Sequence, residues 1–153
     1  MPSILVIDDD ESICETLKVI FERNSAFRVD VANTAADAIK LSNMKTYNAA
    51  FIDIKLPDMS GVELLSKLRD TVPRMIKIMI TGYASLDNAI EALNQGADAY
   101  IRKPFRPDEL LVTLRGKLEA QMDDLMMTQE RISDFIKERV RAIESGTSEK
   151  KVM

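Results

Sequence analysis

The sequence predicts an α/β fold in which five parallel strands form one doubly wound sheet with helices on both of its faces. Short apolar runs alternate with amphipathic segments about five times along the 153 residues. These runs lack the polar alternation of a half-exposed strand, so both faces of each strand should be buried, as in parallel sheets. The connections are short, and right-handed crossovers then place helices on both sides of the sheet.

Each element follows from its local pattern, in chain order. The five apolar runs expected to form strands are SILVI (3–7), FRVDVA (27–32), NAAFID (48–53), IKIMIT (76–81) and DAYIRK (98–103). Between them, apolar residues recur three or four positions apart, which predicts helices. Those helices should cover 11–23, 34–45, 61–70 and 85–95. Gly96 directly after EALNQ is a suitable stop for the fourth helix.

A fifth helix should begin near Pro107 in RPDELL, where proline suits the first turn. Its apolar positions continue beyond the need of one domain, at Leu111, Leu114, Leu118, Met122, Leu125, Ile132, Phe135, Ile136, Val140 and Ile143. Thr128 could cap a new helix, so the segment is either one long helix or a helix followed by a second one at about 129–144.

We therefore expect a domain over 1–118, a helical extension over 119–145 and a disordered tail over 146–153. An amphipathic stripe must be covered by something. Our hypothesis is that the extension serves dimerisation or docking of a partner, and the alternative is that it folds back on its own domain.

Composition excludes several classes of function. The net charge of −4 and the pI of about 5.0 argue against direct nucleic-acid binding. No apolar run approaches the roughly 18 residues of a membrane span, and the chain starts without a secretion signal, so we expect a cytoplasmic protein. The absence of histidine excludes Ser-His-Asp and Cys-His catalysis and most zinc sites. The single cysteine, Cys14, forms no internal disulfide and should pack in the core.

Polar residues that could bind ligands or react lie at the carboxyl ends of the expected strands, where doubly wound sheets bind ligands. The first strand is followed by Asp8 and Asp9, and the most buried run ends at Asp53. The fourth strand ends at Thr81, and the fifth ends at Lys103. If the first and third strands are neighbours, their carboxylates lie roughly 5 Å apart.

Such a carboxylate cluster needs a cation. Ligands that are all oxygen, without histidine or cysteine, indicate Mg²⁺, with Mn²⁺ possible. Lys103 is long enough to reach Asp53 across roughly 10 Å, Thr81 offers a hydroxyl between them, and Gly82 leaves room for an approaching group. A carboxylate, a divalent metal, a lysine and a hydroxyl together describe a site that forms an aspartyl phosphate.

Four motifs carry a family resemblance over about residues 3–118: ILVIDDDES, FIDIKLPDMSGVELL, ITGYAS and ADAYIRKPF. They resemble the receiver domain of two-component response regulators. The resemblance implies a flavodoxin-like sheet of strand order 2-1-3-4-5. It also implies that Asp53 accepts a phosphoryl group from a sensor histidine kinase or a phosphotransfer protein.

The resemblance further assigns the metal ligands. Asp8 and Asp9 would hold Mg²⁺ together with Asp53, with Asp9 binding directly and Asp8 through water. The backbone carbonyl of Lys55 would complete the ligands that the protein supplies. Such a protein is a phosphoacceptor that assists its own phosphorylation and dephosphorylation, and not an enzyme in the usual sense.

By the same resemblance, Thr81 and Lys103 bind the phosphoryl oxygens, and Thr81 and Tyr100 form a switch pair. Phosphorylation would then shift the surface of the fourth helix, fifth strand and fifth helix. Tyr100 could also be an ordinary half-buried strand aromatic. The Lys103-Pro104 peptide bond is expected to be cis. We hypothesise that Lys55 and Tyr83, two residues beyond Asp53 and Thr81, set the phosphoryl lifetime by controlling access of water.

Neighbouring residues have simpler expected roles. Asp10 should cap the first helix and Asp58 a turn, while Pro57 and Gly61 shape the loop after Asp53.

Two other functions fit these residues poorly. A phosphatase of the haloacid-dehalogenase type needs a second aspartate where this chain has Lys55. A flavin or nucleotide carrier needs a glycine-rich phosphate loop, but three acids follow the first strand. The chain could also be the receiver part of a longer transcription regulator.

Overall fold

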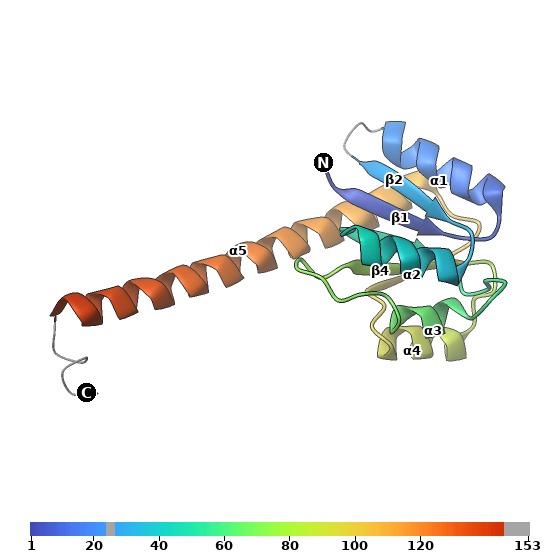
Figure 1. Cartoon of the computed structure of the whole chain (residues 1–153). Helices are drawn as coiled ribbons and strands as arrows, with labels where there is room; N and C mark the ends of the chain where they lie inside the picture. The colour runs from blue at the N-terminus through green and yellow to red at the C-terminus, as the bar shows by residue number, and fades with distance from the viewer. Residues whose placement is uncertain (24–26, 146–153) are drawn as a thin grey trace. The chain divides into compact units, whose positions relative to one another are not determined.

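The computed structural model describes residues 1–23 and 27–145 (Figure 1). The chain divides into two compact units, Met1–Glu119 and Ala120–Met153. The tail expected over 146–153 lies outside the described residues.

Five parallel strands form one sheet in the first unit, in the order β2-β1-β3-β4-β5. Their bounds are β1 Ser3–Ile7, β2 Arg28–Ala32, β3 Ala49–Ile52, β4 Ile76–Thr81 and β5 Ala99–Arg102. The predicted doubly wound sheet and its strand order are confirmed. This order places the carboxyl ends of β1, β3, β4 and β5 at one edge. The predicted site residues all lie within three residues of one of these strand ends.

Helices cover both faces of this sheet (Figure 1). Their bounds are α1 Glu11–Arg23, α2 Ala35–Met44, α3 Gly61–Leu65, α4 Leu86–Asn94 and α5 Pro107–Ser145. The first turns of α5 and the apolar side of α1 pack in one core, and α2, α3 and α4 pack in the other.

Alternate strand residues point into the two cores, which is why the strands read as continuous apolar runs. In β3, Ala50 and Ile52 belong to the core under α2, while Ala49 and Phe51 belong to the core under α1. The ring of Phe51 lies 4.9 Å from that of Phe21 on α1, between centroids. Both faces of the sheet are therefore buried.

Helix α3 ends at Leu65, five residues before its predicted end. The carbonyl oxygen of Leu65 accepts a hydrogen bond from the Lys77 ammonium group, at 2.9 Å, and burial lowers the pKa of this lysine. Beyond Leu65, the Arg69 side chain turns toward α2 and donates to the carbonyl of Ser42, at 2.8 Å. A lysine on β4 thus satisfies a carbonyl that a longer helix would have paired with its own backbone.

Helix α5 is continuous from Pro107 to Ser145, which decides between the two arrangements left open by the sequence. Thr128 does not cap a second helix. Its hydroxyl donates to the carbonyl of Asp124, at 2.9 Å, one turn earlier in the same helix. In the described part of the chain, none of the helices combines the length and apolar character needed to cross a bilayer.

A buried tyrosine ties β2 to the segment before β3. The Tyr47 hydroxyl donates to Asp30 Oδ2 at 2.6 Å, and this bond, against a smaller effect of burial, lowers the pKa of Asp30. Tyr47→Phe should lower the free energy of unfolding by about 1 kcal/mol, a charged hydrogen bond reduced for the partial exposure of Asp30. Urea unfolding with Tyr83→Phe as an exposed control measures this.

The loss of unfolding free energy in Tyr47→Phe should depend on pH. Because the pKa of Asp30 is lowered by folding, its contribution is present above its ordinary value of 3.8 and is lost as the pH falls through its folded value. The difference between wild type and Tyr47→Phe should therefore narrow below about pH 3.8. A difference that stays constant with pH would show that the lost stability is packing alone.

Candidate functional site

Backbone hydrogen bonds fix the main chain of three site residues one step beyond the strands. Asp8 donates its N–H to the carbonyl of Ala32, at 3.1 Å, and Asp53 donates to that of Ile7, at 2.9 Å. Lys103 donates to the carbonyl of Thr81, also at 2.9 Å. These residues therefore continue the ladder of the sheet, which holds their side chains over its carboxyl edge.

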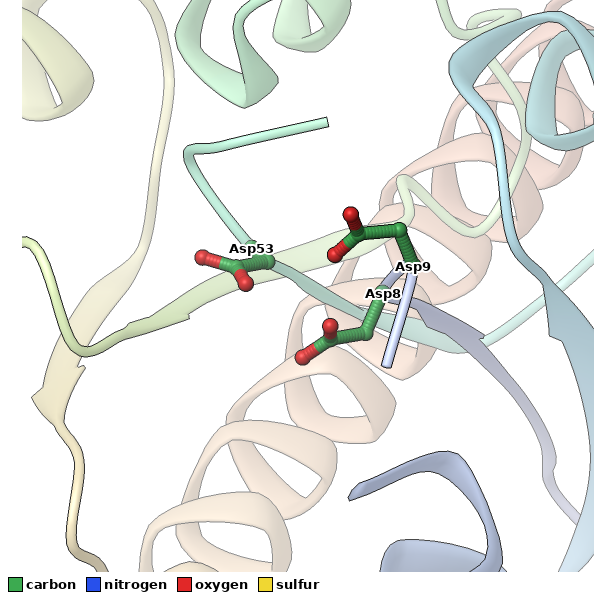
Figure 2. A group of neighbouring side chains, drawn as sticks. All are labelled: Asp8, Asp9 and Asp53. Carbon is green, nitrogen blue, oxygen red and sulfur yellow. The ribbon is translucent and has the colours of Figure 1, made fainter. Parts of the chain in front are cut away.

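Three carboxylates meet at this edge, as Figure 2 shows. Oxygen atoms of Asp8, Asp9 and Asp53 all lie within 4.8 Å of one another. Asp8 and Asp53 are buried, while Asp9 is exposed. Side chains from two neighbouring strands thus converge as the sequence predicted.

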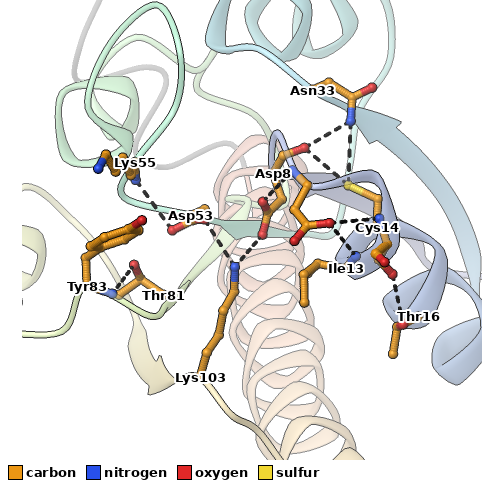
Figure 3. A network of polar contacts seen from close by, with 12 residues as sticks. Asp8, Ile13, Cys14, Thr16, Asn33, Asp53, Lys55, Thr81, Tyr83 and Lys103 are labelled. Carbon is orange, nitrogen blue, oxygen red and sulfur yellow. Dashed lines mark hydrogen bonds and ion pairs between the residues drawn. The ribbon is translucent and has the colours of Figure 1, made fainter.

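The Lys103 ammonium group lies between the two buried carboxylates (Figure 3). Its nitrogen is 2.7 Å from Asp8 Oδ2 and 3.1 Å from Asp53 Oδ2. Burial by itself would lower the pKa of Lys103, but hydrogen bonding to Asp8 and the charge of Asp53 outweigh it and raise this pKa. The lysine is therefore held in its charged form.

The positive charge of Lys103 does not neutralise the negative charge of the carboxylate cluster. Burial raises the pKa of Asp8, the negative charge of Asp53 adds to this rise, and the hydrogen bond from Lys103 offsets only part of it. The cluster therefore favours additional positive charge. Its ligands are carboxylate oxygens, with one side open to solvent through Asp9, and such a donor set fits a hard divalent cation such as Mg²⁺ or Mn²⁺.

Thr81 lies beside this cluster at the end of β4, fully buried. Its Oγ1 accepts a hydrogen bond from the N–H of Tyr83, at 3.1 Å (Figure 3). The hydroxyl is therefore within the site but is engaged with the loop that leads to α4.

Lys55 and Tyr83 come together on the other side of Asp53. The Lys55 N–H points at Asp53 Oδ1, at 3.4 Å, and its ammonium nitrogen lies 4.4 Å from the centroid of the Tyr83 ring. This cation–π pair forms part of the lining of an open hollow of about 340 Å³ that also includes Met59.

The Tyr100 hydroxyl is bound to α4. Its hydroxyl donates to Oδ1 of Asn88, in the first turn of α4, in a short hydrogen bond. Burial raises the pKa of this half-buried tyrosine. Asn88 was missed by the sequence analysis, although the spacing of Ser85 and Asn88 is that of a capping box, which the structure contains.

Asp10, Cys14 and Asn33 make contacts next to the carboxylate cluster. Asp10 Oδ1 accepts from the N–H of Ser12, at 2.9 Å, so it caps α1 as expected. The Cys14 thiol is buried, donates to the carbonyl of Asp8 at 3.3 Å, and has a pKa raised by burial to about 11. Asn33, also missed, donates to the same carbonyl at 3.0 Å.

Asp58 does more than cap a turn. Its two carboxylate oxygens accept from the N–H groups of Ala35 and Ala36, each at 2.9 Å, at the start of α2. These bonds lower the pKa of Asp58. The sequence did not predict these bonds, because the partners lie 22 and 23 residues away in the chain.

The backbone after Asp53 and Lys103 is tightly shaped. The Lys103-Pro104 peptide bond is cis, as expected. A β-carbon added at Gly61 would overlap the carbonyl oxygen of Asp53, whereas one added at Gly82 would meet no atom within 4 Å. Glycine at 61 is therefore required for the start of α3 to approach Asp53.

Comparison with known proteins gives a consistent result. Residues 4–115 match the family described as the response regulator receiver domain. A crystal structure of a CheY-like response regulator receiver domain protein from Methanospirillum hungatei is 44% identical, with a TM-score of 0.77, over 81% of this chain and 98% of that one. A response regulator from Burkholderia pseudomallei, solved with a phosphorylated aspartic acid and a calcium ion, is 29% identical, with a TM-score of 0.70, over 91% and 86%.

The curated relatives are longer proteins. The transcriptional regulatory protein ZraR of Klebsiella oxytoca is 36% identical over 115 residues, which are 75% of this chain and 26% of ZraR. The chain thus spans about a quarter of the length of that relative.

Gly61→Ala should disturb the site through the backbone. We expect a loss of about 1–3 kcal/mol in the free energy of unfolding, because the new methyl group forces the start of α3 away from Asp53. Gly82→Ala is the matched control and should change stability by no more than about 0.5 kcal/mol. Urea unfolding of the two variants distinguishes them, and equal losses would contradict the close approach at Gly61.

Proposed function

This chain belongs to the response regulator receiver domain family of two-component signal transduction, and we propose that it is a signalling switch in which Asp53 is the phosphoacceptor. The donor would be a sensor histidine kinase or a phosphotransfer protein. The observation that carries the proposal is the convergence of Asp53, two further carboxylates and Lys103 at one sheet edge. The phosphorylated aspartic acid in the Burkholderia relative supports it.

Asp53 has the role of the nucleophile. One of its carboxylate oxygens forms a bond to phosphorus while the bond between phosphorus and the histidine nitrogen of the donor breaks. Lys103 contacts Asp53 Oδ2 and would neutralise an oxygen of the arriving phosphoryl group. The Thr81 hydroxyl would donate to another of these oxygens after it moves from its present contact.

The carboxylates of Asp8, Asp9 and Asp53, with the backbone carbonyl of Lys55, would hold Mg²⁺ or Mn²⁺. The ion supplies positive charge that stabilises the phosphoryl oxygens during transfer. Since Asp8 is already bound to Lys103, an indirect contact through water suits it better than a direct one, whereas the exposed Asp9 is open for direct binding. The chain would assist its own phosphorylation and dephosphorylation.

The surface that would respond includes α4, β5 and the first turns of α5. Three large apolar residues of α4 are exposed to solvent, Leu86, Ile90 and Leu93. The phosphoryl group adds charge near Thr81, and the Thr81–Tyr100 switch pair would transmit the change to this surface. A partner that prefers one arrangement of this surface would then bind according to phosphorylation.

The second unit would provide self-association or docking of a partner. The extension leaves an apolar stripe exposed on the described part of the helix, which includes Met122, Ile132, Ile136, Val140 and Ile143. The spacing of three or four residues from Ile132 to Ile143 keeps these side chains on one side of the helix, as in a helix that pairs with another, and Met122, ten residues before Ile132, falls on the same side. We infer that a second copy of this chain covers the stripe.

A second candidate is favoured by the comparison with ZraR. The same receiver would then be the regulatory part of a longer transcription regulator, and phosphorylation would act on domains outside this sequence. Asp53 and its chemistry are the same in both cases.

Asp53→Ala should abolish phosphorylation. With a radiolabelled small acyl phosphate and Mg²⁺, the wild type should incorporate label at Asp53, and chelation of Mg²⁺ should remove the incorporation. Asp87→Ala, at an exposed acid on α4, is the control and should label normally. Efficient labelling of Asp53→Ala at another residue would refute the assignment.

We propose that Lys55 and Tyr83, which contact each other beside Asp53, hinder the approach of water to the phosphorylated side chain. Replacing both by alanine should then shorten the lifetime of the phosphorylated state several-fold. Decay of the label after removal of the donor measures this. Lys40→Ala, at an exposed lysine of α2, should decay as the wild type does. An unchanged decay rate in the double variant would count against the proposed shielding.

Ile132→Glu with Ile136→Glu should prevent self-association, because two charges would enter the apolar stripe. Light scattering coupled to gel filtration should then give the mass of a monomer. Met127→Glu is the matched control, since Met127 is exposed but lies on another side of the helix. A full chain that is already monomeric, and whose hydrodynamic size is unchanged by removal of 120–153, would favour the folded-back alternative.

A further inference from the structure

Asn88 makes hydrogen bonds of two kinds in the first turn of α4. Two of them close the capping box: its N–H donates to Ser85 Oγ at 3.2 Å, and its Oδ1 accepts from the N–H of Ser85 at 3.1 Å. The other two leave the helix. Its Nδ2 donates to the carbonyl of Tyr83 at 2.7 Å, and its Oδ1 accepts from the Tyr100 hydroxyl.

These outward bonds connect the two members of the proposed switch pair. Tyr83 donates its N–H to Thr81 Oγ1, and its carbonyl oxygen accepts from Asn88 Nδ2. The Tyr100 hydroxyl donates to Oδ1 of the same Asn88 amide. Thr81 and Tyr100 are thus joined through one loop residue and one side chain. The connection runs through four residues that are all in the described part of the first unit.

We propose that Asn88 is a positioning residue that holds Thr81 and Tyr100 together in the resting arrangement of the switch. The proposal rests on the proposed function, because it takes these two residues as the switch pair. Movement of the Thr81 hydroxyl toward Asp53 strains the bond from Tyr83, and inward rotation of Tyr100 breaks its bond to Asn88. Because both bonds belong to the same chain of contacts through Asn88, breaking one weakens the other, and the two movements are coupled.

An asparagine is required for both contacts at once. The amide supplies a donor for the Tyr83 carbonyl and an acceptor for the Tyr100 hydroxyl. Aspartate keeps the acceptor but loses the donor, and alanine loses both. The two variants Asn88→Asp and Asn88→Ala therefore separate the contact with Tyr100 from the contact with Tyr83.

The chain has three tyrosines, so incorporation of 3-fluorotyrosine gives three ¹⁹F NMR signals that tyrosine-to-phenylalanine variants assign. The Tyr100 signal is recorded in the full chain alone and with Mg²⁺ and beryllofluoride, a mimic of the phosphoryl group. In the chain alone, Asn88→Ala should move the Tyr100 signal toward its position in the wild type with beryllofluoride. Asn88→Asp should leave it closer to the resting position.

Asn88→Ala should also bind beryllofluoride at least about fivefold more tightly, since loss of the hydrogen bond to Tyr100 alone, present only in the resting arrangement, corresponds to that factor. Tyr100→Phe removes the same bond from its other end. The double variant should therefore gain no more than Asn88→Ala alone, because Asn88→Ala already removes the bond to Tyr100. Asn94→Ala, at the exposed end of α4, is the control and should match the wild type.

Two results would overturn the proposal: a Tyr100 signal in Asn88→Ala that stays at the resting position, or additive effects of Asn88→Ala and Tyr100→Phe on the binding of beryllofluoride. Thermal unfolding of each variant confirms that it is folded. A wild type that binds no beryllofluoride with Mg²⁺ would instead refute the proposed function, while the ¹⁹F signals of the chain alone would still report whether Asn88 positions Tyr100.

Discussion

The ammonium group of Lys103 lies between two carboxylates that the fold buries side by side, and the site depends on this interaction. Burial removes water from Asp8 and Asp53, and their like charges repel each other. Lys103 offsets part of this cost, yet the pKa of Asp8 remains raised. The remaining negative charge makes the cluster suitable for a divalent cation, and it is also the charge balance that an added phosphoryl group would change.

The site has two parts, the charged cluster and the segment from Thr81 to Asn88, and different kinds of hydrogen bond hold them. Backbone ladder bonds position Asp8, Asp53 and Lys103, and moving them would require opening the sheet. The segment from Thr81 to Asn88 is held mainly by bonds that involve side chains, which exchange at lower cost. A rigid half that receives a charge and an adjustable half that responds to it are the requirements of a switch.

Sequence patterns were sufficient for the strands and for the acidic cluster, because parallel strands bring their carboxyl ends to one edge whatever else the chain does. They were insufficient where a side chain acts across a long separation in the chain. Lys77 on β4 binds the carbonyl at the end of α3, and Asn88 on α4 binds Tyr100 on β5. Such contacts depend on the finished tertiary structure and leave no periodic signal in the sequence.

The bonds from Asp58 to the start of α2 have a consequence for how this protein can be altered. The stretch between Asp53 and α3 is held at two places: Asp53 is bonded to the sheet, and Asp58 is bonded to the start of α2, an earlier helix in the chain. Insertions or deletions here would break the bonds from Asp58 to the start of α2, while the ladder bond would still hold Asp53 on the sheet. The length of this loop is therefore set by the distance between two anchoring points, and substitutions of its side chains should disturb the fold less than changes in its length.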